Sequence, residues 1–227
     1  MAGRRSGSGG RKGKAAEGKV AEGKVAAGKA AEGARPATGD AVIAAAMRLF
    51  AERGWKDTSL ADIGEAAGIG FPELHALFPS KAAVLRAFLS GVDRTVLATA
   101  AEAGASVREA LFELMMRRFD ALQPHRAAMQ CLARDLPRDP AAAACVAMRV
   151  CSSIGAIAER AGVATTGPLG AMRIKALVGL HAWVVRAWLA DDSADMARTM
   201  KALDKGLERL EAIAQSFPGA RPLPNAA

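Results

Sequence analysis

The chain has 227 residues, of which 51% are hydrophobic and only 4% aromatic, and it carries a formal net charge of +8 at pH 7. This is enough apolar material for one or two domains with a sizeable core, so the folded part should be stable on its own. Alanine is abundant, tyrosine is absent, and no run alternates strictly between apolar and polar residues as a half-buried strand would. The composition therefore predicts an all-α protein.

The three cysteines, Cys131, Cys145 and Cys151, are an odd number without CxxC spacing. This usage suits a reducing cytoplasm better than a disulfide framework. No stretch of about 18 uncharged apolar residues is present, and the basic N-terminus lacks the apolar segment of a signal peptide. We therefore expect a soluble, cytoplasmic protein.

The positive charge is concentrated in the N-terminal tail. Residues 1–39 hold nine Lys and Arg against three Glu, whereas residues 40–90 hold five basic against six acidic residues. The pentads AAEGK, VAEGK, VAAGK and AAEGA fit neither the helix nor the strand period, and each Gly costs a helix about 1 kcal/mol relative to Ala. We expect residues 1–38 to be a disordered basic tail, either merely solvated or an arm that contacts DNA phosphates.

A helix-turn-helix pattern follows the tail. Apolar residues at helical spacing predict a first helix over residues 41–53, with Asp40 as its N-cap and Gly54 at its end. Thr58 or Ser59 should cap a second short helix that ends at Gly68. A new helical stretch begins directly after this glycine, and two short helices joined by so tight a turn are typical of a helix-turn-helix unit.

The segment from Leu49 to Leu85 resembles the N-terminal domain of TetR/AcrR-type transcriptional regulators. The resemblance lies in LFAERG at the end of the first helix, in the TSLADIGEAAG helix and in FPSK at the start of the fourth. It implies an all-α, TetR-like fold with a three-helix head over residues 39–88, a ligand-binding and dimerising helical body over residues 89–217, and a disordered end over residues 218–227. It also implies a homodimer, a double-stranded DNA operator and release of that DNA by a small apolar effector.

The recognition helix departs from the family pattern where DNA would be bound. The usual Ser-Lys and Gly-Thr-Leu-Tyr-x-Tyr are replaced here at Gly70, Phe71, Pro72, Glu73, His75 and Leu77. Donors to phosphate are thus lost, although His75 can still donate and Glu73 could accept from cytosine N4. The candidate DNA-binding residues are Thr58, Gly70, Phe71, Glu73, His75 and Lys81. The alternative for Phe71, Glu73 and His75 is a packing residue, a solvated charge and an ordinary surface imidazole.

The body is predicted to contain further helices over residues 80–98 and 107–122 and a helical segment from His125 that ends around DLPRDP, where Pro137 and Pro140 make a corner. An Ala-rich helix then runs to Ala161, another is opened by Pro168, and a last one begins near Ser193. Its soft apolar side chains suit a ligand cavity, although ordinary core packing explains them equally simply. The candidate pocket residues are Phe112, Met115, Met116, Phe119, Met148, His181 and Trp183. A lone histidine on an apolar face, such as His181, is more typical of a core than of a ligand site.

The last predicted helix has apolar residues at alternating steps of four and three, a coiled-coil-like seam. The seam contains Met196, Met200, Leu203, Leu207, Leu210, Ala214 and Phe217. We expect dimerisation through residues 168–190 and 194–217, with Leu203, Leu207 and Leu210 in the interface. Exposed alone, the seam could instead lie on a membrane surface.

No catalytic or metal-binding motif is present in the sequence, so neither an enzyme nor a cofactor is expected. Two functions remain open. One is a DNA-binding, ligand-responsive repressor. The other follows from a resemblance of RRFDALQPHRAAMQCLARDLPRDP and DDSADMARTMKALDKGLERLE to the TetR-fold accessory family of ubiquinone biosynthesis, which binds lipid and not DNA.

Overall fold

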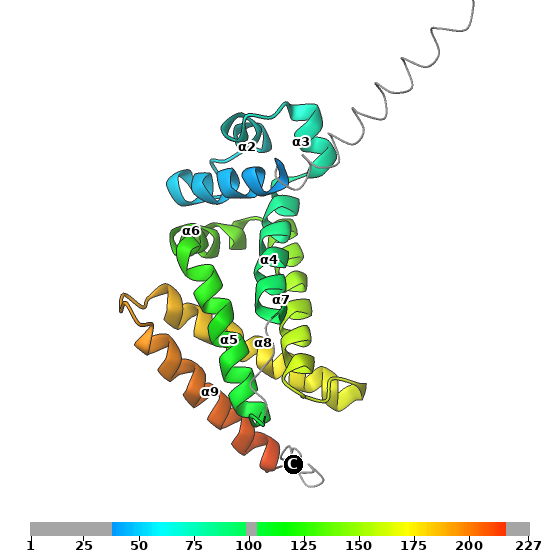
Figure 1. Cartoon of the computed structure of the whole chain (residues 1–227), viewed down its shortest axis with the longest axis vertical. Helices are drawn as coiled ribbons and strands as arrows, with labels where there is room; N and C mark the ends of the chain where they lie inside the picture. The colour runs from blue at the N-terminus through cyan, green and yellow to red at the C-terminus, as the bar shows by residue number, and fades with distance from the viewer. Residues whose placement is uncertain (1–37, 99–103, 217–227) are drawn as a thin grey trace, which may run out of the picture. The chain divides into compact units, whose positions relative to one another are not determined.

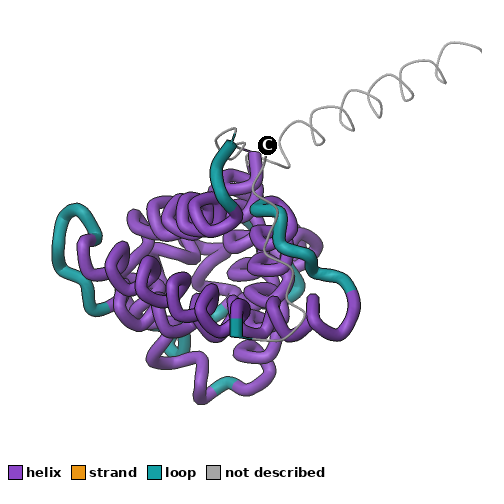
Figure 2. The backbone as a smooth tube through the Cα atoms, turned by 90° about the horizontal axis from the view of Figure 1, so that it is seen from below, coloured by secondary structure: helices purple, strands orange, loops and turns teal. Residues whose placement is uncertain are grey.

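The computed structural model describes residues 38–98 and 104–216, and every regular element in these ranges is helical (Figures 1 and 2). The predicted all-α class is therefore confirmed for this part of the chain. From Val42 onward the chain forms one compact unit. The segments predicted to be disordered, 1–38 and 218–227, lie outside the described residues apart from Thr38, as does Phe217.

The head begins with a helix that includes residues 42–53 and ends at Gly54, where φ is +85°. Asp40 is not its N-cap, because Thr38 and Gly39 are already helical; a carboxylate inside the first turns is favoured by the helix dipole. The second helix, α2 (Leu60–Ala67), is capped by Ser59, whose hydroxyl accepts from the Asp62 backbone while the Asp62 carboxylate accepts from Ser59. The predicted capping box is thus confirmed.

The next helices run close to the predicted boundaries. Proline occupies the first turn of α7 and of α8, where the missing N–H has no intrahelical partner to lose. The helices are α3 (Phe71–Leu77), α4 (Lys81–Ala98), α5 (Val107–Leu122), α6 (Arg126–Asp135), α7 (Pro140–Arg160), α8 (Gly167–Leu189) and α9 (Ala197–Gln215). Short 3-10 turns, Gln123–His125 and Leu136–Arg138, precede α6 and α7.

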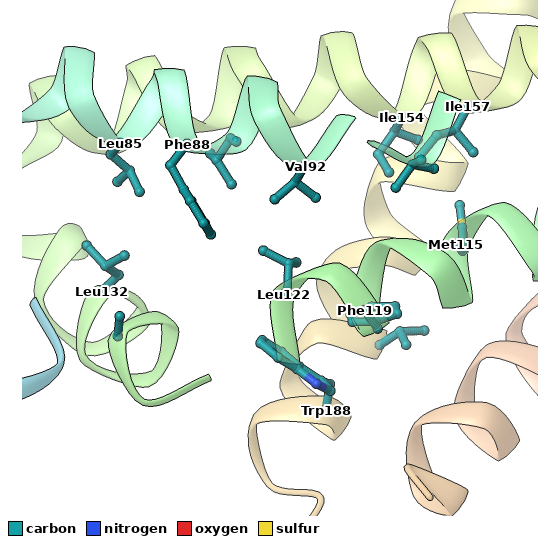
Figure 3. Close-up of a cluster of buried hydrophobic side chains, with 14 of the residues drawn as sticks. Leu85, Phe88, Val92, Met115, Phe119, Leu122, Leu132, Ile154, Ile157 and Trp188 are labelled. Carbon is teal, nitrogen blue, oxygen red and sulfur yellow. The ribbon is translucent and has the colours of Figure 1, made fainter. Parts of the chain in front are cut away.

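The body core is assembled from one side of each of several helices. Helix α4 packs on α5 and α7, and α8 packs on α7 and α9. Figure 3 shows the side chains that meet between them: Leu85, Phe88 and Val92 from α4, Met115, Phe119 and Leu122 from α5, Leu132 from α6, Ile154 and Ile157 from α7 and Trp188 from α8. All of these are 7% exposed or less, so the apolar area removed from water holds the helices together.

Helix α7 is long and apolar enough, by length and composition alone, to cross a membrane. In the fold it is part of the core, because Ile154, Ile157 and Ala158 are fully buried. Its Arg149 donates to the buried Asp93 of α4, so the helix also carries a charged contact inside the protein. These contacts pack one side of α7 against the rest of the chain.

The connection between α8 and α9 is organised by one buried carboxylate. Asp191, 1% exposed, accepts from the backbone N and Oγ1 of Thr199, both at 2.8 Å, and from the Oγ of Ser193 at 2.5 Å. Burial raises the pKa of Asp191, but the hydrogen bonds from Ser193 and Thr199 outweigh that effect and hold the pKa below its usual range. Because Ser193 belongs to this turn, the last helix starts at Ala197 and not near Ser193, as the sequence had suggested.

We expect Asp191→Ala to lower the free energy of unfolding by about 1–3 kcal/mol, since it leaves the buried Thr199 N–H and hydroxyl without an acceptor. Urea unfolding followed by circular dichroism measures the change. The control is the neighbouring Asp192→Ala, which removes a carboxylate that is 93% exposed and pairs only with Arg126. Equal losses for the two variants would contradict the role given to Asp191.

Candidate functional site

The crossing of α2 and α3 depends on a glycine. A Cβ on Gly64 would lie 3.0 Å from Cδ2 of Leu74 and 3.3 Å from the Ile69 carbonyl oxygen. Leu74 is fully buried, and the left-handed Gly68, with φ of +70°, makes the turn between the helices. The two short helices are therefore packed in close contact with the buried side of α3 fixed, which is the geometry of a helix-turn-helix unit.

The opposite side of α3 is open to solvent. Phe71 is 53% exposed, and Glu73 and His75 are exposed beside it. The rings of Phe71 and His75 have their centroids 6.0 Å apart. Gly70 is the extended N-cap residue of α3. Four of the residues predicted to bind DNA are therefore exposed on α3 and at its start, with Phe71 and His75 as neighbours on one face, and Phe71 is not a turn-packing residue.

The other two predicted DNA-binding residues have internal partners. Thr58 is 1% exposed, and its Oγ1 donates to the Gly54 carbonyl oxygen at 2.7 Å. It cannot reach a phosphate, so that expectation is wrong. The Lys81 Nζ donates to the carbonyl oxygens of Trp55 at 2.6 Å and of Thr58 at 3.0 Å. Lys81 thus stabilises the loop before α2, and burial lowers its pKa against the opposing fields of Asp139 and Asp57.

Trp55, which the sequence reading did not single out, links the head to the body. Its ring is 3% exposed and lies under the Lys81 ammonium, 4.5 Å from the ring centroid. Its backbone N–H donates to Asp135 at the end of α6, and its indole Nε1 donates to Asp139, the N-cap of α7, both at 3.1 Å. In the sequence, this role could have been inferred from the position of the tryptophan directly after Gly54, the glycine that ends the first helix. Polar residues are more common at such a turn position.

A charged cluster lies inside the body. The Asp93 carboxylate of α4 accepts from Arg118 of α5, from Arg149 of α7 and, at 2.5 Å, from the Ser153 hydroxyl. Asp93, Arg118 and Ser153 are 4%, 1% and 1% exposed. Desolvation lowers the pKa of Arg118, while Asp93 opposes that shift. Two charged residues within otherwise apolar helix faces, Asp93 and Arg118, were the available sequence signal.

His181 of α8 lies beside this cluster. It is 4% exposed and stacks on Phe119 of α5, with ring centroids 5.6 Å apart. Its Nδ1 has no hydrogen-bond partner among the described residues. Desolvation, together with the positive charge of Arg118, lowers the pKa of His181 from 6.5 to about 3, so the imidazole is neutral near pH 7.

The predicted pocket residues divide into three groups. Met115, Phe119 and His181 are buried together in the body, and Phe112 and Met116 are half-buried around them. Met148 and Trp183 are not in the interior: they are 66% and 44% exposed, because α7 and α8 turn these positions outward. The prediction that they line a pocket is therefore wrong.

The predicted dimer seam also needs correction. Leu203 and Leu207 are 0% and 4% exposed within the single chain, and Leu210 is half-buried, because this face of α9 packs on α8. At Gly206 an added Cβ would lie 2.1 Å from Cδ1 of Leu180, so the two helices are in close contact. Leu203 and Leu207 have no surface left for a second copy.

The apolar surface that stays exposed is on α8 instead. We call it the α8 stripe; it consists of Leu169, Met172, Ala176, Gly179 and Trp183, at steps of three and four residues. Its large members are 61%, 48% and 44% exposed at Leu169, Met172 and Trp183. Residues at this spacing share one helix face.

Within residues 38–98 and 104–216, no group of three or more His, Cys, Asp or Glu side chains is placed to hold a metal ion. The exposed α3 and the helices packed behind it define an all-helical protein that contains a helix-turn-helix unit.

Comparison with known proteins is consistent with this class and narrows it. Residues 42–88 match the family model of bacterial regulatory proteins of the tetR family. The chain is 46% identical over 50 residues to the HTH-type transcriptional repressor ComR of Escherichia coli, a match that spans 24% of that protein's length and 22% of this chain.

Solved structures extend the likeness to the body. A TetR transcriptional regulator from Nitrosomonas europaea has a TM-score of 0.62 at 22% identity, over 75% of this chain and 96% of that one. A TetR-family regulator from Syntrophomonas wolfei has a TM-score of 0.59 at 14% identity, over 82% of this chain and all (100%) of that one. Residues 42–88 are thus similar in sequence to the tetR family, and the fold of the chain is similar to that of solved TetR-family regulators.

We expect Lys81→Met to lower the free energy of unfolding by about 1–3 kcal/mol in the absence of DNA, because the carbonyls of Trp55 and Thr58 lose a charged donor. Lys56→Met, which removes an exposed lysine of the same loop, should change it by less than about 0.5 kcal/mol. Chemical unfolding measures both. If Lys81→Met lowers the free energy of unfolding no more than Lys56→Met does, the Lys81 ammonium is free to bind phosphate.

His181 should make stability depend on pH. Because its folded pKa of about 3 lies below its ordinary 6.5, the unfolded chain takes up a proton first as the pH falls. The contribution of the neutral His181 to the free energy of unfolding is complete above pH 6.5. It is lost between pH 6.5 and 3, at up to about 1.4 kcal/mol per pH unit. His181→Leu should flatten this part of the pH profile. An unchanged slope in His181→Leu would contradict the assignment.

Proposed function

We propose that the protein is a DNA-binding transcriptional regulator that acts as a homodimer and responds to a small ligand. The observation that carries the proposal is the exposed side of α3, held by the buried Leu74 in a head that matches the tetR family model. A helix of this kind, packed on its neighbour by one face, offers the other face to the major groove. The proposal assigns no reaction to the chain and implies that it acts in the cytoplasm.

Base contact in this head would differ from the pattern of the family. The exposed surface of α3 has no lysine or arginine; it presents the Phe71 ring, the Glu73 carboxylate and the His75 imidazole. An apolar ring contacts the thymine methyl group, a carboxylate accepts from cytosine N4, and an imidazole can donate to a base or a phosphate. These three side chains would supply sequence preference and little general affinity for phosphate.

A second copy of the chain would cover the α8 stripe. Ala176 and Gly179 in its middle have small side chains, which lets the backbones of two helices approach closely. Leu169, Met172 and Trp183 on either side then bury apolar area against the partner. A two-fold axis through the stripe makes the interface self-complementary, as symmetric dimers require, and places two recognition helices on one DNA duplex.

The ligand response would start in the body. Helix α4 connects the two parts: it begins with Lys81, which holds the Trp55 loop of the head, and it carries Asp93 into the body cluster. A molecule bound among α4, α5, α7 and α8 that favours one position of α4 over another would shift the head with it. Met115, Phe119 and His181 are the predicted pocket residues that lie in this region.

The lipid-binding alternative, which follows from the resemblance of the body, expects the last helix to meet a membrane through an exposed apolar seam. That seam is used internally, since Leu203 and Leu207 are buried against α8. The outward face of α9 carries exposed charged residues: Lys201, Asp204, Lys205, Glu208, Arg209 and Glu211. A helix with this outer face is a poor match for a membrane surface, so we favour the regulator.

Selection of bound sequences from a random duplex library with the full-length protein tests DNA reading. We expect a sequence with two-fold symmetry to be enriched. Phe71→Ala should then weaken binding to it by about tenfold, the value of one base contact. Replacing the contacted thymine by uracil, which removes only the methyl group, should weaken the unmodified protein but not Phe71→Ala. Failure to enrich any sequence would contradict the proposed function.

Met172→Glu should shift the protein from dimer to monomer, because it places a charge in the buried apolar contact between copies. Sedimentation velocity measures the change. Met148→Glu is the matched control: Met148 is even more exposed, at 66%, but lies on α7 outside the α8 stripe. If the two variants dissociate equally, or if the unmodified protein is a monomer, the stripe is not the interface.

A further inference from the structure

The body cluster contains more positive than negative charge. The guanidiniums of Arg118 and Arg149 both donate to the one carboxylate of Asp93. Among the described residues no other carboxylate forms an ion pair with either of them, and the neighbouring His181 is neutral near pH 7. Arg118 is 1% exposed, so water cannot screen the excess charge there.

Three nitrogens around the cluster lack a hydrogen-bond partner in the described part of the chain. They are Nε of Arg118, Nε of Arg149 and Nδ1 of His181, from α5, α7 and α8, and all are buried. A buried donor without an acceptor costs about 1–3 kcal/mol, more for a charged group. The two arginine Nε–H groups are unpaired donors next to excess positive charge, which is what a carboxylate needs for recognition, because its oxygens accept several charge-assisted hydrogen bonds. Nδ1 of the neutral His181 joins them in the tautomer that carries the ring proton there.

The surroundings of these nitrogens are apolar. Phe119 stacks on His181, and its ring centroid is 5.8 Å from that of Trp188 (Figure 3). Met115, one turn away from Phe119 on α5, is fully buried. A molecule that contacted both the unpaired nitrogens and these apolar side chains would carry one anionic group and an otherwise apolar body.

The cluster can be reached from one side. The Arg149 side chain is 22% exposed, whereas those of Arg118 and Asp93 are 1% and 5% exposed. Arg149 therefore lies at the solvent edge of the cluster, while Arg118, which donates to the same Asp93 carboxylate, lies in its interior.

We propose that this cluster binds the carboxylate of a small organic anion through Arg149, Arg118 and His181, and that this anion is the effector of the proposed regulator. The assignment of this anion as the effector rests on the proposed function. The anion differs from the apolar effector expected from the sequence in that it carries a negative charge. The bound carboxylate competes with Asp93 for the two guanidiniums, which weakens the hold of α5 and α7 on α4, the helix that carries Lys81 to the head.

Calorimetric titration of the full-length protein with straight-chain monocarboxylates, from acetate to decanoate, tests the site. We expect affinity to rise with chain length and to fall by about tenfold or more for the neutral amides of the same length. Inorganic phosphate and chloride, as anions without an apolar body, should bind more weakly than the longer carboxylates.

Two variants locate the binding. Arg149→Met leaves the Asp93–Arg118 pair in place and should weaken carboxylate binding by about tenfold. Arg160→Met removes an exposed arginine from the same helix and should not. If Arg149→Met fails to fold, the comparison of carboxylates with amides on the unmodified protein still decides the question.

The proposal is overturned if no carboxylate binds, if the amides bind equally well, or if phosphate or chloride binds as tightly as the longest carboxylate. DNA binding is measured separately. Carboxylate binding without any change in affinity for the selected DNA would support the site and contradict ligand-responsive regulation. Sequence-specific DNA binding without carboxylate binding would support the regulator and overturn the effector assignment.

Discussion

The buried carboxylate of Asp93 is the interaction on which the arrangement of the body depends. It joins α4 to α5 through Arg118 and to α7 through Arg149 and Ser153, so three helices meet at one charged group in an apolar interior. A buried ion pair adds little net stability compared with apolar packing, but losing one partner leaves an uncompensated charge. The relative positions of these helices are therefore restricted, and under our proposal a ligand that changed the partners of the guanidiniums would change the position of α4.

Helix α4 carries this constraint to the head. Its first residue, Lys81, holds the carbonyls of Trp55 and Thr58, while Trp55 also donates to Asp135 and Asp139 at the corner between α6 and α7. The loop before α2 is thus tied to two elements of the body at once. Because α2 and α3 are packed in close contact at Gly64, a displacement of this loop would move the recognition helix as a unit.

The exposed surfaces divide the proposed tasks among different helices. Helix α3 presents Phe71, Glu73 and His75 from the head, and α8 presents the apolar stripe from the body, so reading DNA and meeting a second copy would not compete for the same residues. The ligand would act on neither surface directly. It would bind in the interior, where low dielectric makes a single charge effective over the short distances between helices.

The sequence by itself determined the helical class, most helix boundaries and the helix-turn-helix unit, because these follow from local chemistry. Periodic apolar residues, the Ser59 capping box, Gly54, Gly68 and the first-turn prolines act within a few residues of chain. The start of the last helix was misplaced, because Ser193 is drawn into a turn by the more distant Thr199 and the buried Asp191.

Only the tertiary structure decided which apolar face each helix buries and where its polar residues find partners. The seam on α9 has the pattern of a dimer interface, yet α8 of the same chain covers Leu203 and Leu207 and exposes a stripe of its own. Likewise Lys81 and Thr58 are residues of types that can bind phosphate, but nearby loop carbonyl oxygens accept the hydrogen bonds of their side chains. The spacing of residues along a helix predicts which of them share a face. Which element packs on that face depends on contacts between residues far apart in the chain.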